Sequence, residues 1–246
     1  MKLQVCGNKA ELGARASANA IQTVREALVR NGLASIVVAT GTSQFDLLQN
    51  LSASKDIDWS RVVMFHLDEY IDLPETHPAS FRKYLKERFI SKLPALKACY
   101  LIDGDATDPA KECERVERFI QAHKKIDIAI LGLGMNGHIG MNEPGTSASL
   151  RSHVSKLDPQ TQEVGQKYFK SKTALTNGLT LGMATILEAK HIFLLVSGAK
   201  KASIAGKMIT EEISEQLPCT LLRNHTGLRI YLDKEAATQL PPNYQQ

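Results

Sequence analysis

Residues 126–145 read IDIAILGLGMNGHIGMNEPG, an apolar run that passes directly into a glycine-rich segment. Short runs this apolar are typical of strands in parallel sheets whose two faces are both covered by helices. Five further apolar runs flank this one along the chain, and amphipathic helical patterns lie between most of them. The sequence therefore predicts an α/β fold: a doubly wound, mostly parallel, Rossmann-like sheet with helices on both faces.

The predicted elements alternate along the chain without a long linker, a repeat or a low-complexity tract, so residues 1–246 are expected to form a single domain. The expected strands are 34–40, 61–70, 98–102, 126–134, 191–198 and 228–234. The expected helices are 10–32, 45–53, 80–93, 108–124 and 199–213. Asn31-Gly32 has the chemistry of a helix C-cap, and Asp108-Pro109 that of an N-cap followed by the first helical residue.

Composition excludes several classes of protein. Of the 246 residues 43% are hydrophobic, enough for a large core, and the net charge is only +4. The lysines are scattered rather than gathered into a patch, so no nucleic-acid partner is expected and a small anion suits the charge better. Four distant cysteines without a C-x-x-C pair predict reduced thiols. No signal peptide or membrane-length apolar run is visible, which predicts a cytoplasmic protein with no membrane partner.

Four polar clusters follow four of the predicted strands, at the point where each strand ends. They read TGTSQ (40–44), HLDEY (66–70), GMNGHIGMNEP (134–144) and SGAKK (197–201). In open parallel sheets, ligands bind beyond the carboxyl ends of the strands. We therefore expect these clusters to meet at one edge of the sheet and to form the site.

The TGTSQ cluster has the chemistry of a phosphate-binding turn. Gly41 permits close approach of a ligand to the backbone, and Thr40, Thr42 and Ser43 offer hydroxyl groups. The next helix would add free N–H groups. The cluster is not a Walker A loop. The alternative is an ordinary strand-to-helix turn capped by Ser or Thr.

Asp68 and Glu69 are adjacent carboxylates at a strand end, and on extended backbone they face opposite ways. At most one of them is therefore expected in the site. An aspartate whose partly buried setting brings its pKa nearer neutrality is a suitable base for a carbon acid. The alternative is that both are solvated charges at the start of a loop.

The glycine-rich segment contains a G-x-G-x-x-G match, but no amphipathic helix follows it, so the nucleotide-binding interpretation lacks its required context. A tight glycine turn that presents His138 as an acid or base fits better, because imidazole titrates near neutral pH. Glu143 could orient the ring and stabilise its charged form. The alternative is a histidine that only satisfies hydrogen bonds of the turn.

The combination of LDEY…LPETHP with LGLGMNGHIGMNEPG resembles the glucosamine-6-phosphate deaminase/isomerase family over nearly the whole chain. The pattern G-x-N-G-H-x-G-x-N-E-P-G is also similar to the galactosamine-6-phosphate branch of that family. The related 6-phosphogluconolactonases share the Gly-His turn but typically have D-E-R in place of D-E-Y and lack N-E-P. The resemblance implies a fold of the sugar-phosphate isomerase type.

The resemblance further implies conversion of a hexosamine 6-phosphate and water into a ketohexose 6-phosphate and ammonia, without a metal or another cofactor. His138, assisted by Glu143, would open the sugar ring, and Asp68 would move a proton between C2 and C1. The segment Thr40–Ser43 would hold the phosphate together with Lys201. The small-molecule partner would be an amino-sugar phosphate. The sequence leaves open whether the protein forms a homo-oligomer.

Two positions depart from the family pattern. Lys167 stands where the family often has arginine. It would attract the phosphate as a point charge but could not form the paired hydrogen bonds of an arginine. Asn136 stands where many members have aspartate, and an amide can accept a ring N–H but brings no charge. Residues 148–178, with few strong apolar periods, are expected to form a mobile lid that excludes water.

Three classes of function remain after these observations. A deaminase/isomerase acting on glucosamine or galactosamine 6-phosphate is favoured by the joint occurrence of D-E-Y and H-I-G-M-N-E-P. A sugar-phosphate lactonase of the 6-phosphogluconolactonase kind would need no base at C2. A non-catalytic sugar-phosphate sensor would find its main support in Asn136.

Overall fold

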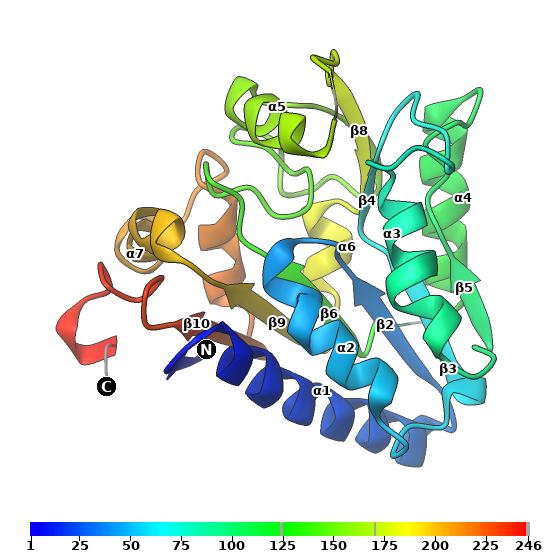
Figure 1. Ribbon diagram of the computed structural model, residues 1–246, viewed down its shortest axis with the longest axis horizontal. Coiled ribbons are helices and arrows are strands. Elements are labelled where there is room, and N and C mark those ends of the chain that lie inside the picture. The colour runs from blue at the N-terminus through cyan, green and yellow to red at the C-terminus, as the bar shows by residue number, and fades with distance from the viewer. Residues whose placement is uncertain (124, 170, 245–246) are drawn as a thin grey trace.

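The computed structural model describes residues 1–123, 125–169 and 171–244, and two sheets organise this part of the chain (Figure 1). Seven parallel strands form the central sheet in the order β1-β10-β9-β6-β2-β3-β5. These strands are β1 (Lys2–Cys6), β2 (Ala34–Val38), β3 (Val62–His66), β5 (Ala98–Tyr100), β6 (Ile128–Gly132), β9 (His191–Val196) and β10 (Leu228–Asp233). Three antiparallel strands, β4 (Asp68–Tyr70), β8 (Asn177–Thr180) and β7 (His153–Lys156), form the second sheet in that order.

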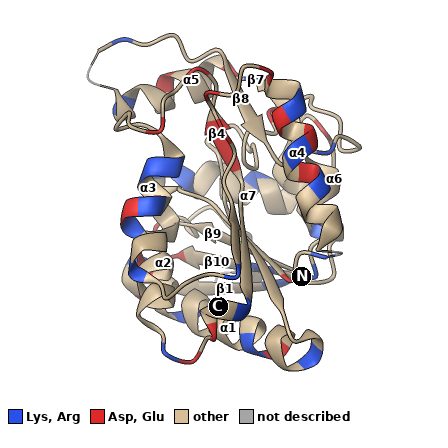
Figure 2. Ribbon diagram, turned by 90° about the vertical axis from the view of Figure 1, so that its right-hand side faces the viewer, with Lys and Arg blue, Asp and Glu red and all other residues tan. Residues whose placement is uncertain are grey.

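Helices cover both faces of the central sheet, as Figure 2 shows. One face carries α1 (Lys9–Asn31), α2 (Phe45–Ala53) and α3 (Phe81–Arg88), and the other carries α4 (Pro109–Ala122), α6 (Met183–Leu187) and α7 (Ala202–Thr210). Along β2 the side chains alternate between these layers, since Ile36 and Val38 pack on the first side and Val37 on the second. The predicted doubly wound, mostly parallel sheet with helices on both faces is confirmed.

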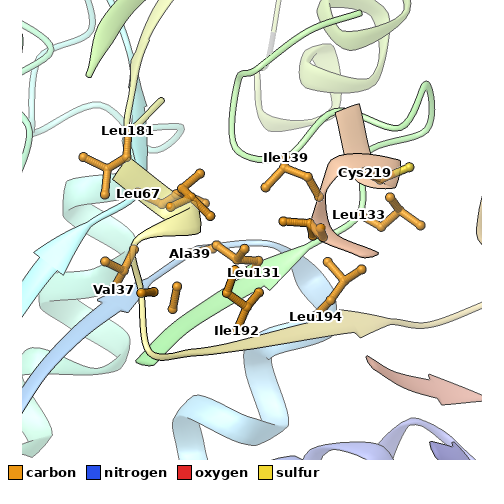
Figure 3. Packing of buried hydrophobic residues seen from close by; sticks show 14 of the residues in the cluster. Val37, Ala39, Leu67, Leu131, Leu133, Ile139, Leu181, Ile192, Leu194 and Cys219 are labelled. Carbon is orange, nitrogen blue, oxygen red and sulfur yellow. The ribbon is translucent and has the colours of Figure 1, made fainter. Parts of the chain in front are cut away.

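The core reaches from the sheet into the loops beyond its carboxyl edge (Figure 3). Leu131 on β6 and Leu194 on β9 belong to the same buried cluster as Ile139, which follows β6 within the glycine-rich turn. Ile139 is completely buried. The turn is therefore fixed to the core by an apolar side chain next to His138.

The predicted helix caps are present. Gly32 has a φ of 71° and its N–H donates to the Leu28 carbonyl, which closes α1. The side chain of Asp108 accepts from the N–H of Lys111, with Pro109 as the first residue of α4. The predicted helix 108–124 ends on residue 124, which lies outside the described residues.

The single strand predicted at 61–70 is wrong, because the chain changes sheets at Leu67. The Leu67 N–H donates to the Val38 carbonyl of the central sheet over 3.1 Å, and its carbonyl accepts from Leu181 N–H beside β8 over 2.9 Å. β3 therefore ends at His66, and β4 begins at Asp68 as a strand of the second sheet. The sequence passes from the apolar β3 into Asp-Glu-Tyr without a turn residue, so it gives no sign of this change of partner.

Other boundaries also differ from the predictions. The predicted helix 80–93 ends at Arg88 and continues as a 3-10 turn, and the first residues of the predicted helix 199–213 form a 3-10 turn before α7. β1 was not predicted because, as an edge strand, it keeps polar side chains partly exposed. Within 148–178 the structure places β7 and α5 (Pro159–Gly165); residue 170 lies outside the description.

No helix in the described part of the chain is long and apolar enough to cross a membrane. All four cysteines fall within the described ranges, and none of them forms a disulfide.

Glu69 connects β4 to the start of α3 through hydrogen bonds. Its fully buried carboxylate accepts hydrogen bonds from the backbone N–H groups of Tyr70, Phe81 and Arg82 and from the hydroxyl of Ser80. The Arg82 guanidinium lies 3.3 Å away. Burial raises the pKa of Glu69, and these donors oppose the rise. Glu69 is thus a structural anchor that points away from the face of Asp68.

We expect Glu69→Gln to lower the free energy of unfolding by about 2 to 4 kcal/mol, measured by urea denaturation. The variant places an NH₂ group against N–H donors and removes the buried partner of Arg82. Glu75→Gln, which breaks an exposed pair with Lys86, is the matched control and should cost less than about 1 kcal/mol. Equal losses in the two variants would contradict the anchoring role.

Candidate active site

The strand order changes direction between β2 and β6, and ligand sites in open parallel sheets are expected at such a point. From β2 the chain winds outward through β3 to β5, then returns to β6 on the other side of β2 and continues to β9 and β10. At such a switch point the connections leave the two strands in opposite directions, and ligands of open α/β sheets bind beyond the carboxyl ends there. Thr40–Ser43 follow β2 there, and the turn with His138 follows β6. In Figure 1 the second sheet and α5 lie beyond the same edge.

Two glycines shape the turn that carries His138. Gly137 has a φ of 88°, a conformation that side chains with a Cβ rarely adopt. Gly134 donates its N–H to the His138 carbonyl over 2.9 Å, and its Cα lies against the imidazole. A Cβ at Gly134 would come within 2.4 Å of ring atoms Cγ and Nε2 of His138. The glycines thus leave room for the His138 ring, which folds back over its own turn. No nucleotide-binding helix follows this turn.

Nδ1 of His138 faces two oxygen atoms. It lies 3.4 Å from Oε2 of Glu143 and 3.0 Å from the hydroxyl of Thr161 on α5. Asn136 donates from Nδ2 to the same Glu143 oxygen over 2.8 Å, and its Oδ1 accepts from the His138 N–H over 3.2 Å. The His138 side chain is 20% exposed. Asn136, His138 and Glu143 therefore form one connected group.

Glu143 is buried and ionised. Burial alone would raise its pKa, but hydrogen bonding and charge from His138, with hydrogen bonds from Asn136 and Thr161, hold the pKa below its usual value. Its second oxygen, Oε1, is buried and has no hydrogen-bond partner among the described residues. A negative charge thus lies 3.4 Å from Nδ1 of the imidazole.

Asp68 occupies a different environment at the start of β4. It is 8% exposed, and burial, together with the negative charge of Glu69, raises its pKa to about 7. Within the described chain no donor stabilises the ionised form of this carboxylate. Its partner in the sheet register is Thr180, whose hydroxyl accepts from the Met141 N–H over 3.1 Å. Asp68 therefore lies on the strand beside the segment that carries His138 and Glu143.

The turn after β2 is not capped by a Ser or Thr side chain, which was the alternative to a phosphate-binding turn. Neither the 3-10 turn Thr42–Gln44 nor α2 has a side-chain hydrogen bond at its N-cap. The Ser43 hydroxyl instead lies 3.0 Å from that of Ser197, which joins the ends of β2 and β9. Thr40 is buried at the same place. The turn is therefore held by backbone and serine contacts and not by a side-chain cap.

Two lysines approach this edge from different segments. Lys201 donates from Nζ to the Leu133 carbonyl after β6. Burial, together with the positive charge of Lys167, lowers the pKa of Lys201 to about 8. Lys167 is exposed, with Nζ 4.8 Å from the centre of the Tyr168 ring. The structure therefore brings both predicted lysines into electrostatic contact.

The sequence analysis missed two residues at this edge. Thr161 contacts His138 from a helix that was not predicted, and no local pattern indicates that contact. Gln44 is fully buried, and neither of its side-chain polar atoms has a hydrogen-bond partner among the residues described. Its amide fits between Gly41 and Gly132, where a Cβ would approach to 2.6 and 2.9 Å respectively. Both glycines therefore leave room for Gln44 between β2 and β6.

Comparison with known proteins identifies the family of the chain. The family model of glucosamine-6-phosphate isomerases and 6-phosphogluconolactonases matches residues 7–231. Glucosamine-6-phosphate deaminase 1 of Bacillus subtilis (strain 168) is 34% identical over 243 residues, covering 98% of this chain and 99% of the relative. The glucosamine-6-phosphate deaminase of Streptococcus uberis is 36% identical over 222 residues, 90% of this chain and 93% of the relative.

Solved structures extend the likeness to three dimensions. A structure described as a monomeric glucosamine-6-phosphate deaminase superposes with a TM-score of 0.90 at 32% identity, covering 97% of this chain and 100% of the other. The 6-phosphogluconolactonase of Trypanosoma brucei has a TM-score of 0.77 at 19% identity, with 98% of each chain covered, which shows a shared fold. The chain is therefore an enzyme that belongs to the family of glucosamine-6-phosphate isomerases and 6-phosphogluconolactonases.

Proposed function

We propose that the protein is a hexosamine-6-phosphate deaminase that converts glucosamine 6-phosphate and water into fructose 6-phosphate and ammonia. The observation that carries the proposal is that two carboxylates at one edge of the sheet differ in pKa. Asp68 has a pKa near neutrality, whereas Glu143 stays charged beside His138. The names of the relatives in Bacillus subtilis and Streptococcus uberis support the same reaction. No metal or other cofactor enters this mechanism.

Substrate binding is assigned to the turn after β2 and to the two lysines. The hydroxyls of Thr40, Thr42 and Ser43, with the close backbone at Gly41, would surround the phosphate. The N–H groups at the start of the 3-10 turn Thr42–Gln44 would bind it, and the charges of Lys167 and Lys201 would neutralise it. The segment 148–178, which carries Lys167, is proposed to act as a lid over the bound sugar. We also propose a cytoplasmic location, in keeping with the unpaired thiols.

Ring opening is assigned to His138. Its Nε2 would take the proton of the anomeric hydroxyl and return a proton to the ring oxygen, so that the C1–O5 bond breaks. During this step the imidazolium is stabilised by Glu143. Asn136 would hold the Glu143 carboxylate in place through its 2.8 Å hydrogen bond.

The isomerisation is assigned to Asp68. Its carboxylate would remove the proton from C2 of the open-chain aldehyde, giving an enolamine, and the proton would then be delivered to C1. The product is an imine at C2, to which water adds before ammonia leaves and the ketose remains. A base with a pKa near 7 is well matched to a proton that moves off carbon and back again.

Galactosamine 6-phosphate is the second candidate substrate, because Asn136 lies in a motif similar to that of the galactosamine branch. The decisive experiment measures ammonia release from both hexosamine phosphates, with fructose 6-phosphate and tagatose 6-phosphate identified as products. Turnover of either sugar establishes the deaminase and selects the epimer. Absence of ammonia from both, combined with hydrolysis of 6-phosphogluconolactone, would overturn the proposal in favour of a lactonase.

We expect Asp68→Asn to abolish exchange of the C2 proton with deuterated solvent while the substrate still binds. In the unmodified enzyme the base works deprotonated, so kcat/KM should fall as the pH drops through about 7. Exchange followed by NMR and binding followed by calorimetry measure the two effects. Normal exchange in this variant would mean that another residue is the base.

We expect kcat/KM also to fall as the pH rises through about 8, because Lys201 then loses the charge that attracts the phosphate. Lys201→Arg should remove this alkaline limb, since arginine stays protonated. Lys200→Arg, an exposed neighbour, is the matched control and should leave the profile unchanged. An alkaline limb that persists in Lys201→Arg would assign it to a different group.

A further inference from the structure

Thr161 brings a hydroxyl to the group formed by His138 and Glu143. The hydroxyl lies 3.0 Å from Nδ1 of His138, and a hydrogen bond from it helps to lower the pKa of Glu143. We propose that Thr161 is a positioning residue that selects the tautomer of His138, so that α5 completes the acid–base centre. This inference rests on the proposed function, because it explains how the histidine is prepared for ring opening.

The chemistry of ring opening demands one tautomer. To remove a proton from the anomeric hydroxyl, Nε2 must present a lone pair, and the single hydrogen of the neutral ring must then be on Nδ1. An Nδ1–H group needs an acceptor. The Thr161 oxygen supplies one at 3.0 Å, closer than the Glu143 oxygen at 3.4 Å.

The Thr161 hydroxyl has only one hydrogen, and the direction in which it points decides the tautomer. If it donates to Glu143, its oxygen is free to accept from Nδ1–H. If it donates to Nδ1, the ring carries its hydrogen on Nε2 and cannot act as the base. Because Glu143 is ionised, it attracts the hydroxyl hydrogen, and the productive arrangement is favoured.

The position of Thr161 depends on how α5 contacts β4. Gly165, at the end of α5, lies so close to Tyr70 that a Cβ there would be 2.9 Å from the Tyr70 hydroxyl oxygen. The same Cβ would be 2.8 Å from Cδ1 of Leu175. The missing side chain therefore lets α5 approach the strand that also bears Asp68. A displacement of the segment 148–178 would remove the nearer of the two oxygen atoms that face Nδ1 of His138 and leave that of Glu143.

The test compares Thr161→Val, which keeps the shape and removes the hydroxyl, with Thr161→Ser, which keeps the hydroxyl. Nitrogen-15 NMR of the histidine rings in the substrate-free protein identifies the tautomer, with His138→Gln used to assign the resonances. We expect the unmodified protein and Thr161→Ser to hold the hydrogen on Nδ1, and Thr161→Val to shift it toward Nε2.

Kinetics provide the second readout. We expect Thr161→Val to lower kcat by about 10- to 100-fold, the range seen when a partner of a functional histidine is lost, with little change in KM. Thr161→Ser should restore most of the rate. Gln160→Ala, an exposed neighbour on α5, should behave as the unmodified enzyme and so control for damage to the helix.

An unchanged tautomer in Thr161→Val, or an equal loss of rate in Thr161→Ser, would overturn the inference. The NMR result does not require a substrate. If the tautomer shifts as expected but no hexosamine phosphate is turned over by the unmodified protein, the proposed function fails and the positioning role stands.

Discussion

The site depends on Leu67, whose backbone hydrogen-bonds to both sheets. Leu67 gives its N–H to β2 and its carbonyl to the segment after β8, so a single residue ends one strand and starts another. Its buried side chain packs among residues of both sheets and of the His138 turn, as Figure 3 shows. Because the chain changes sheets here, Asp68 lies beyond the carboxyl edge of the central sheet instead of within it.

The next two residues show how neighbouring carboxylates acquire different properties. Glu69 points toward α3 and is surrounded by donors, which makes it part of the framework. Asp68 points the other way and receives no such support, so burial raises its pKa to about 7. The charge of Glu69 adds to that rise. Glu69, which anchors β4, thus also helps to raise the pKa of Asp68, the residue to which we assign proton transfer.

The sequence predicted those features whose causes are local. The helix 45–53 matches α2, and the caps at Gly32 and Asp108 are present, because cap chemistry lies within a few residues. The polar clusters at strand ends were recognisable because parallel topology brings strand ends together. The change of sheet at Leu67 and the contact of Thr161 with His138 depend on partners far away in sequence, and no periodicity encodes them.

The asparagine at position 136 has a physical rationale in this arrangement. An aspartate there would place a second carboxylate against Glu143, and the two would have to share a proton or repel each other. The Asn136 amide instead donates to Glu143 and leaves it as the single anion beside the ring. When His138 is protonated, this group of three side chains has no net charge, so burial of the ion pair costs less. Asparagine at this position therefore keeps Glu143 as the single charge on which the proposed ring opening depends.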